Sequence, residues 1–195
     1  MKKLLDFIKL TNDFKKIERA IRVSGSERFE NDAEHSYQLA LVAWYIITKE
    51  KLPLDISKVL MYSLVHDLVE IYAGDMPYHG RTEEMNHQKK ENEHKALSRL
   101  QKEFPEFPGF TNAIEQYEKR DNEESRFVYA LDKFIPMVNI YFDNGRAWKE
   151  RKISLTHLQN SKNRRTKEHP RVHEYWKLFE ELLVAQPDLF LTEAK

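Results

Sequence analysis

The chain has 195 residues, of which 41% are hydrophobic and 33% charged, the balance of a folded globular protein rather than a disordered one. Lysine plus arginine equals aspartate plus glutamate at 32 each, so we expect neither nucleic acid nor a membrane surface as a partner. The absence of cysteine excludes disulfides, thiolate metal sites and cysteine nucleophiles, and it fits a cytoplasmic location. Charged residues interrupt the apolar residues near the N-terminus, so we expect no secretory signal.

Only 5 glycines and 7 prolines interrupt the chain, which favours long helices joined by short loops over a many-stranded sheet. The length suits one compact domain, and no linker or repeat divides the sequence. We therefore expect an all-α fold, a single domain over residues 1–195 built as a bundle of about six to eight helices.

The first predicted helix covers residues 4–21, as one helix or two short ones, because its apolar residues recur at three- and four-residue steps. A loop centred on Gly25 follows. Asn31 or Asp32 can cap a second helix that runs to about residue 49 and should be largely buried, since its apolar residues cover more than one face.

After Pro53, a third helix starts near residue 55, and its apolar residues carry it to Gly74, a plausible C-terminal stop. Further helices are predicted over the ranges 83–104, 110–119, 123–141, 155–160 and 170–185. The 83–104 segment is very polar and should be exposed, whereas the basic stretch 162–167 is interpreted as a solvated loop.

His66 and Asp67 stand side by side inside the apolar 55–74 segment. Adjacent helical residues point about 100° apart, so one of the two must face the apolar stripe or its border. Burying an ionised aspartate without a partner costs several kcal/mol, and a metal ion bound by both side chains would remove that cost. Glu70 would lie on the same side of the helix, where it could orient or deprotonate a water.

Two further residues strengthen this interpretation. His35 opens the largely buried second helix, and Asp132 lies in the middle of the apolar 123–141 helix. Taken alone, His35 would be a hydrogen-bonded core histidine, Asp132 one half of a salt bridge, and the His66–Asp67 pair a chance occurrence on a helix surface. Together, two imidazoles and two carboxylates from three helices can hold one six-coordinate ion with positions left for water.

The order His35, His66-Asp67, Asp132 resembles the H…HD…D pattern of the HD superfamily of metal-dependent phosphohydrolases. Three blocks carry the resemblance: residues 28–36 (RFENDAEHS), residues 66–77 (HDLVEIYAGDMP) and residues 130–133 (ALDK). They are similar to the branch that contains bacterial 5′-deoxynucleotidases and their eukaryotic HD-domain relatives. The resemblance covers roughly residues 15–141, the core of the metal site, and the helices within 150–190 should pack on that core.

The resemblance implies that one divalent ion is held by His35, His66, Asp67 and Asp132, that Glu70 and Asp67 serve catalysis, and that Asp75 contacts the sugar of a nucleotide. For Asp75, the alternative is a turn aspartate after Gly74. The ligand set suits manganese, cobalt or iron best, with magnesium or zinc as alternatives. The deoxynucleotidases carry an Arg-Trp pair upstream of the first metal histidine, but residues 18–22 read ERAIR and contain no tryptophan.

The candidates for phosphate binding are three arginines upstream of the first metal histidine, Arg19, Arg22 and Arg28. For Arg28, a surface role is equally consistent with the sequence. The missing tryptophan leaves the discrimination against ribonucleotides, and the nucleotide substrate itself, open.

The expected reaction is hydrolysis of a (deoxy)nucleoside 5′-monophosphate by a metal-activated water. Two alternatives stay open: hydrolysis of another phosphoester, such as a cyclic nucleotide, an alarmone or a small metabolite, or a non-catalytic regulatory protein with a structural metal. Relatives in this branch usually form homodimers, and a homodimer is expected here. The aromatic stretch between Phe134 and Trp148 is one candidate interface, although packing in the core is the expected use of most of it.

Overall fold

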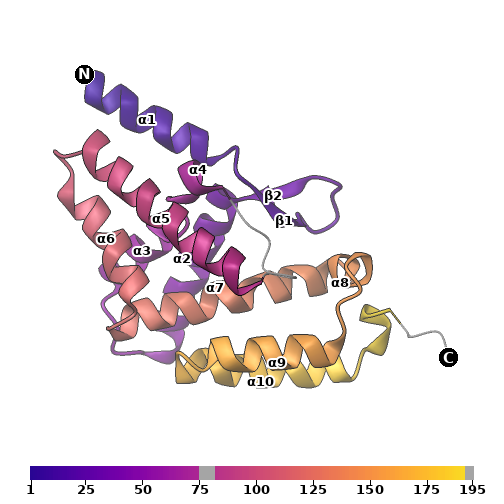
Figure 1. Ribbon diagram of the computed structural model, residues 1–195. Coiled ribbons are helices and arrows are strands. Elements are labelled where there is room, and N and C mark those ends of the chain that lie inside the picture. The colour runs from indigo at the N-terminus through magenta and orange to yellow at the C-terminus, as the bar shows by residue number, and fades with distance from the viewer. Residues whose placement is uncertain (75–81, 192–195) are drawn as a thin grey trace. The chain divides into compact units, whose positions relative to one another are not determined.

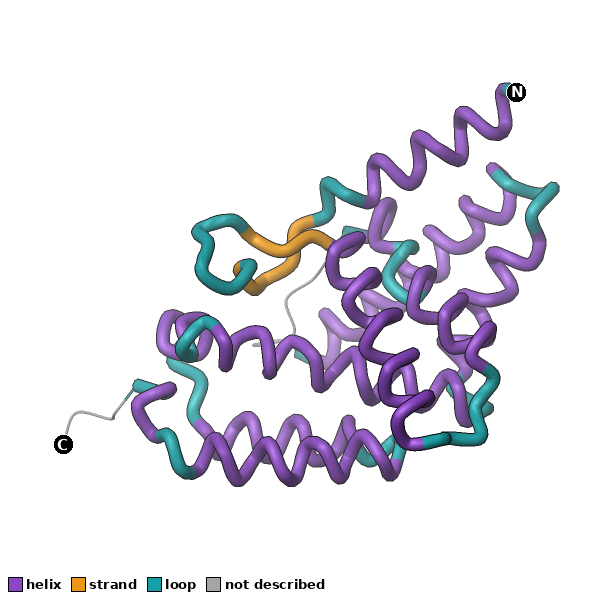
Figure 2. Tube along the Cα trace, turned by 180° about the vertical axis from the view of Figure 1, so that it is seen from behind, coloured by secondary structure: helices purple, strands orange, loops and turns teal. Residues whose placement is uncertain are grey.

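The computed structural model describes residues 1–74 and 82–191, and most of them are helical, which confirms the all-α class (Figure 1). A two-stranded hairpin of β1 (Glu18–Arg22) and β2 (Phe29–Asn31) is the sheet that these residues contain (Figure 2). Within the described ranges, no helix combines the length and apolar character that crossing a bilayer requires.

Contacts divide the chain into two compact units. The first unit comprises Met1–Ala20 and Glu30–Lys119, and the second comprises Ile21–Phe29 and Arg120–Lys195. The single domain expected from the sequence stays a prediction, and the two units are described one at a time.

The first unit contains helices α1 to α6: α1 (Lys2–Phe14), α2 (Asp32–Glu50), α3 (Ile56–Val65), α4 (Glu70–Ala73), α5 (Glu83–Glu103) and α6 (Pro108–Lys119). Helix α3 packs against α2 and α6, whereas α5 packs against α4 and α6. A buried cluster around Leu10, Phe14, Leu100 and Ile114 forms part of its core. This packing brings the start of α2, the end of α3 and the short α4 into one region.

The second unit contains α7 (Glu123–Phe142), α8 (Arg146–Glu150), α9 (Leu155–Thr166), α10 (Pro170–Val184) and the short 3₁₀ helix η1 (Pro187–Leu189). Helices α9 and α10 pack against each other and against α7. Trp148 and Trp176, both fully buried, lie in its core. Trp148 therefore packs in this core, and it is unavailable for the interface suggested for that aromatic stretch.

Three predicted elements differ from the structure. Residues 18–21 were expected to be helical, but they lie in β1, because their backbone pairs with β2, which follows a turn and gives no signal in the local periodicity. The predicted helix from about 55 to Gly74 is interrupted after Val65. The basic stretch 162–167 continues α9 instead of forming a loop, since Leu158, Lys162 and Thr166 recur at four-residue steps on a buried face.

Candidate metal centre

The first turn of α2 positions His35. Asn31 caps this helix: its side chain accepts a hydrogen bond from the Glu34 backbone N–H at 3.0 Å, and the Glu34 carboxylate accepts one from the Asn31 N–H at 3.1 Å. Such a reciprocal capping box fixes where the helix begins. His35 follows one residue after Glu34 and is fully buried, so the cap determines which way its ring enters the interior.

The break after α3 positions His66 and Asp67. The Leu68 N–H donates to the Val65 carbonyl at 3.1 Å and the Glu70 N–H donates to the Asp67 carbonyl at 2.9 Å. Each hydrogen bond joins residues three apart in sequence, so the backbone here forms turns tighter than those of an α-helix. An unbroken α-helix would have placed Glu70 over His66, as the sequence suggested. Instead the turn carries the chain from α3 into the separate helix α4, which begins at Glu70.

His66 is buried, and a backbone carbonyl determines which ring nitrogen carries a proton in the neutral form. Its Nδ1 lies 3.0 Å from the Ser63 carbonyl oxygen. A carbonyl oxygen accepts only, so Nδ1 carries a proton, and in the neutral ring the lone pair lies on Nε2. That Nε2 is 3.0 Å from Oδ2 of Asp67. Metal-binding histidines commonly have this arrangement, in which the other ring nitrogen donates to a carbonyl.

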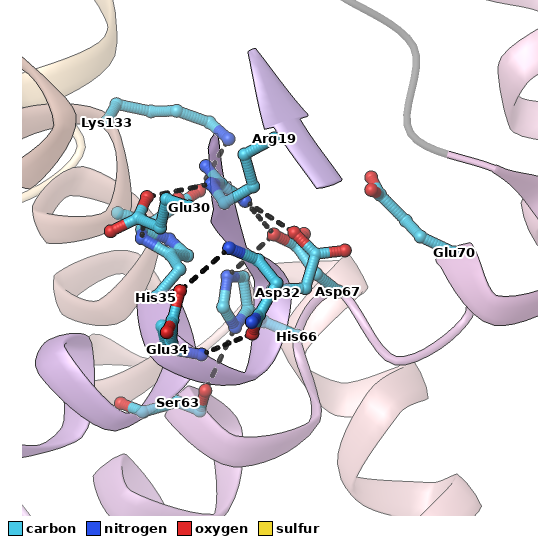
Figure 3. Close-up of polar contacts among 12 residues, drawn as sticks. Arg19, Glu30, Asp32, Glu34, His35, Ser63, His66, Asp67, Glu70 and Lys133 are labelled. Carbon is cyan, nitrogen blue, oxygen red and sulfur yellow. Dashed lines mark hydrogen bonds and ion pairs between the residues drawn. The ribbon is translucent and has the colours of Figure 1, made fainter. Parts of the chain in front are cut away.

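His35, His66 and Asp67 come together in the first unit. One nitrogen or carboxylate oxygen from each lies within 4.8 Å of those of the others. The two imidazole rings have centroids 5.3 Å apart, and Figure 3 shows both rings beside Asp67. Two imidazoles and a carboxylate, largely withdrawn from water, are the donors that a divalent first-row transition metal prefers. The chemistry of this donor set therefore fits a metal ion.

Asp32, Asp67 and Glu70 form a second acidic group, again with one carboxylate oxygen from each within 4.8 Å of the others. Asp32 is fully buried at the start of α2, and Glu70 is only 5% exposed. The sequence suggested Asp32 as a helix cap. Its place at the site depends on the fold, although its position three residues before His35 puts it one turn away on the same helix.

Arg19, a predicted phosphate ligand, lies in β1 among three carboxylates, two from this acidic group and that of Glu30 (Figure 3). Its Nη1 donates to Asp32 Oδ1 at 3.0 Å and to Asp67 Oδ2 at 2.9 Å, and its Nε lies 3.4 Å from Glu30 Oε2. Arg19 thus compensates the negative charge of the acidic residues beside the predicted metal ligands. The sequence did not indicate that Glu30 pairs with Arg19, because only the β1–β2 hairpin brings the two side chains together.

The other predicted site residues belong to the second unit or lie outside the described ranges. Asp132 is 1% exposed in α7, in the second unit, and its neighbour Lys133 has Nζ 2.5 Å from its Oδ2. Arg22 and Arg28 also belong to the second unit; Arg22 donates to Glu150 at 2.6 Å, and Arg28 donates to the Phe29 carbonyl. Asp75 lies outside the described residues. The roles of these four residues stay predictions.

Comparison with known proteins places the chain in a family. The family model described as an HD domain matches residues 11–175. The chain is 29% identical over 137 residues to the mouse (Mus musculus) 5′-deoxynucleotidase HDDC2, a match that covers 67% of this chain and 64% of the mouse protein. The chain therefore aligns with slightly less than two thirds of that relative.

Solved structures agree with this assignment. The crystal structure of a predicted metal-dependent phosphohydrolase from Magnetospirillum magnetotacticum MS-1 is 27% identical, with a TM-score of 0.84 over 97% of this chain and 95% of its own. An HD-domain phosphohydrolase from Listeria innocua, at 16% identity and a TM-score of 0.62 over 95% of this chain and 89% of its own, shares the fold. Since the HD-domain model matches most of the sequence, this chain belongs to the HD-domain family of metal-dependent phosphohydrolases.

Proposed function

We propose that the protein hydrolyses phosphomonoesters, and that its substrates are nucleoside 5′-monophosphates, in the deoxy or the ribo form. The observation that carries the proposal is the buried group of His35, His66 and Asp67 with the carboxylate of Glu70 beside it. The similarity to the mouse 5′-deoxynucleotidase supports a nucleotide as the substrate.

In this proposal His35, His66, Asp67 and, from the family pattern, Asp132 would hold one divalent ion. Manganese, cobalt or iron suits these ligands best, and magnesium or zinc are alternatives. When bound, such an ion supplies Lewis-acid chemistry: it makes a water more acidic and neutralises charge that develops on the phosphoryl oxygens. A purely structural metal site would have no need of a further carboxylate, such as that of Glu70, to take a proton from water.

Glu70 acts as the proton acceptor of the reaction. The water oxygen attacks phosphorus, Glu70 accepts a proton from that water, the ester P–O bond breaks, and the leaving 5′-oxygen takes up a proton to give the nucleoside and inorganic phosphate. The phosphate-binding role of Arg19, Arg22 and Arg28 and the sugar-binding role of Asp75 are part of the proposal. Arg19 would serve the phosphate through its guanidinium group, whose planar arrangement of N–H donors suits phosphoryl oxygens.

The test is release of inorganic phosphate from a panel of ribo- and deoxyribonucleoside 5′-monophosphates with manganese or cobalt added. Asp67→Ala, measured beside the wild type, should lose both metal retention and turnover, because it removes a ligand that the turn after α3 presents. Turnover of deoxy substrates alone would mean that something other than tryptophan rejects the 2′-hydroxyl. A fully active, metal-loaded Asp67→Ala protein would overturn the proposal. If the wild type released no phosphate from any nucleotide of the panel, the nucleotide substrate would be wrong and other phosphoesters would be tested.

A homodimer in the cytoplasm is the further part of this proposal. Apolar side chains line one exposed face of α2 at helical spacing: Tyr37, Leu41, Trp44 and Tyr45, with Trp44 51% exposed. Exposed apolar stripes of this kind are typical of protein interfaces. Sedimentation of the wild type tests the dimer, and a monomer at micromolar concentration would contradict it.

A further inference from the structure

Helix α5 brings a lysine to the proposed proton acceptor. Lys89 Nζ lies 3.0 Å from Oε1 of Glu70, which belongs to α4, and 2.7 Å from Oε1 of Glu93, which lies one turn further along α5. Most of the first two turns of α5 is exposed, but the Lys89 side chain is only 20% exposed, whereas the neighbouring Lys90 is exposed. Lys89 is thus directed inward, although the polar sequence around it gives no sign of this.

The charges around Glu70 explain why a cation is needed there. Its carboxylate is nearly buried, and one of its oxygens lies within 4.8 Å of a carboxylate oxygen of Asp32 and of Asp67. Burial and nearby like charges both disfavour an ionised carboxylate, and a proton acceptor has to be ionised. Lys89 approaches Glu70 from a different helix and supplies the opposite charge.

Lys89 itself is held in the charged form. Burial alone would lower the pKa of its ammonium group, but the charges of Glu70 and Glu93 outweigh burial and raise that pKa above its ordinary value. An ion pair between exposed side chains contributes little, but this pair joins a nearly buried carboxylate to a mostly buried ammonium. The row Glu93, Lys89, Glu70 therefore has a fixed geometry that links the middle of α5 to the start of α4.

We infer that Lys89 is a positioning residue: it holds the carboxylate of Glu70 ionised and in one orientation beside Asp67, and Glu93 holds Lys89 in place. The inference rests on the proposed function, which makes Glu70 the proton acceptor. Lys89 acts through Glu70 and not as a ligand of the substrate phosphate, because two carboxylates already bind its ammonium group. Loss of Lys89 should then lower kcat and leave KM nearly unchanged.

Four variants of the full chain test this role. Lys89→Met should lower kcat about 10- to 100-fold, the range found when a residue that orients a functional group is removed, with KM within about twofold. Lys89→Arg, which keeps the charge, should recover most of that loss, and Glu93→Gln should give a smaller loss than Lys89→Met. Lys90→Met, one residue away on the exposed face, is the matched control and should behave as the wild type.

Coupling to Glu70 gives the decisive comparison. In a Glu70→Gln background, Lys89→Met should cause no further loss of kcat, because the residue through which it acts is already neutral. Calorimetric titration with Mn²⁺ should give a dissociation constant within about threefold of the wild type for Lys89→Met, since Lys89 is paired to Glu70 and not to the predicted ligands. A raised KM alone, loss of Mn²⁺ binding, or an additive loss of kcat in the Glu70→Gln background would each overturn the inference.

Unfolding of the metal-free protein separates this inference from the proposed function. Lys89→Met should lower the stability of the wild type by more than it lowers that of Glu70→Gln, because it leaves a charged carboxylate buried only in the former. Equal losses in the two backgrounds would overturn the Lys89–Glu70 pairing. A wild type without turnover on the nucleotide panel would count against the proposed function, while the unfolding comparison would still decide the pairing.

Discussion

Replacement of Arg19 by methionine should destabilise the metal-free protein strongly. Arg19 lies within 3.4 Å of three carboxylates, of which Asp32 is fully buried and Glu30 is 8% exposed. Methionine keeps much of the side-chain volume but leaves these buried charges without their shared cation. Removal of one partner of a buried ion pair typically costs about 3–5 kcal/mol. For a protein of this size that corresponds to a fall in Tm of roughly 6–20 °C.

A divalent ion should change this result in a specific way. Arg19 donates to Asp67, a predicted metal ligand, so the arginine and the ion neutralise the same carboxylate. Addition of Mn²⁺ should therefore raise the Tm of Arg19→Met by more than it raises that of the wild type, because the competing guanidinium is gone. Differential scanning calorimetry with and without Mn²⁺ measures both effects.

The matched control is Arg99→Met, which removes an arginine whose side chain is 58% exposed and which pairs with Glu103 at 2.7 Å. An ion pair between exposed side chains contributes little to stability, so the Tm of Arg99→Met should stay within a few degrees of the wild type. A Tm of Arg19→Met equal to that of this control would contradict the role of Arg19 in neutralising the buried carboxylates. An equal Mn²⁺ shift in Arg19→Met and the wild type would contradict the competition between Arg19 and the ion at Asp67.

Two predictions concern the second unit. Burial lowers the pKa of His169, so the unfolded chain binds a proton more readily than the folded chain, and stability should fall as pH drops below about 6.5. The fall in Tm between pH 7.5 and 5.5 should therefore be smaller for His169→Asn than for the wild type. The control is His157→Asn, at an exposed position, and its Tm should fall as much as that of the wild type. Gly145 has φ +70°, and a Cβ there would lie 2.1 Å from the Leu189 carbonyl oxygen. Gly145→Ala should cost about 2–4 kcal/mol in urea unfolding, from the left-handed backbone plus the clash. Gly25→Ala has a similar φ of +72° but open space around its Cβ, so it should cost only about 1–2 kcal/mol, and equal losses would contradict the clash.

The local sequence pattern was sufficient to predict the helices whose limits depend on capping residues and on the spacing of apolar side chains. The very polar 83–104 segment is helix α5, as its composition and spacing predicted. The start of α2 depends on Asn31 and Glu34, two residues whose spacing is itself a capping signal. Similarly, Pro170 occupies the first turn of α10, a position that proline favours.

Long-range pairing determined what the sequence could not show. Residues 18–22 have apolar spacing that also suits a helix, and only the pairing with β2 makes them a strand. Arg19 reaches Asp32 and Asp67 because of that strand, across 13 and 48 residues of sequence. No local signal indicated these carboxylate contacts, and the phosphate-binding role of Arg19 stays a prediction beside them.

Long-range contacts also determine the surroundings of Glu70, which the sequence placed in one continuous helix with His66 and Asp67. Helical spacing placed Glu70 near His66 and Asp67, and the structure does bring its carboxylate within 4.8 Å of Asp67, but through a turn and a new helix. Proximity was predictable because three residues of chain cannot separate two side chains far. The orientation of Glu70 was not predictable, because Lys89, the cation that binds it, lies 19 residues further along, in the polar first half of α5.

Arg19 and Lys89 together suggest how an acidic site folds before it binds an ion. Each cation comes from an element distant in sequence and contacts a different part of the acidic group, Arg19 at Asp32 and Asp67 and Lys89 at Glu70. Buried carboxylates without such partners would oppose folding by several kcal/mol. Arg19 shares Asp67 with the predicted ion and so has to yield some of its contact when that ion binds, whereas Lys89 contacts no predicted ligand and can stay. Metal affinity should therefore be sensitive to Arg19, and turnover to Lys89.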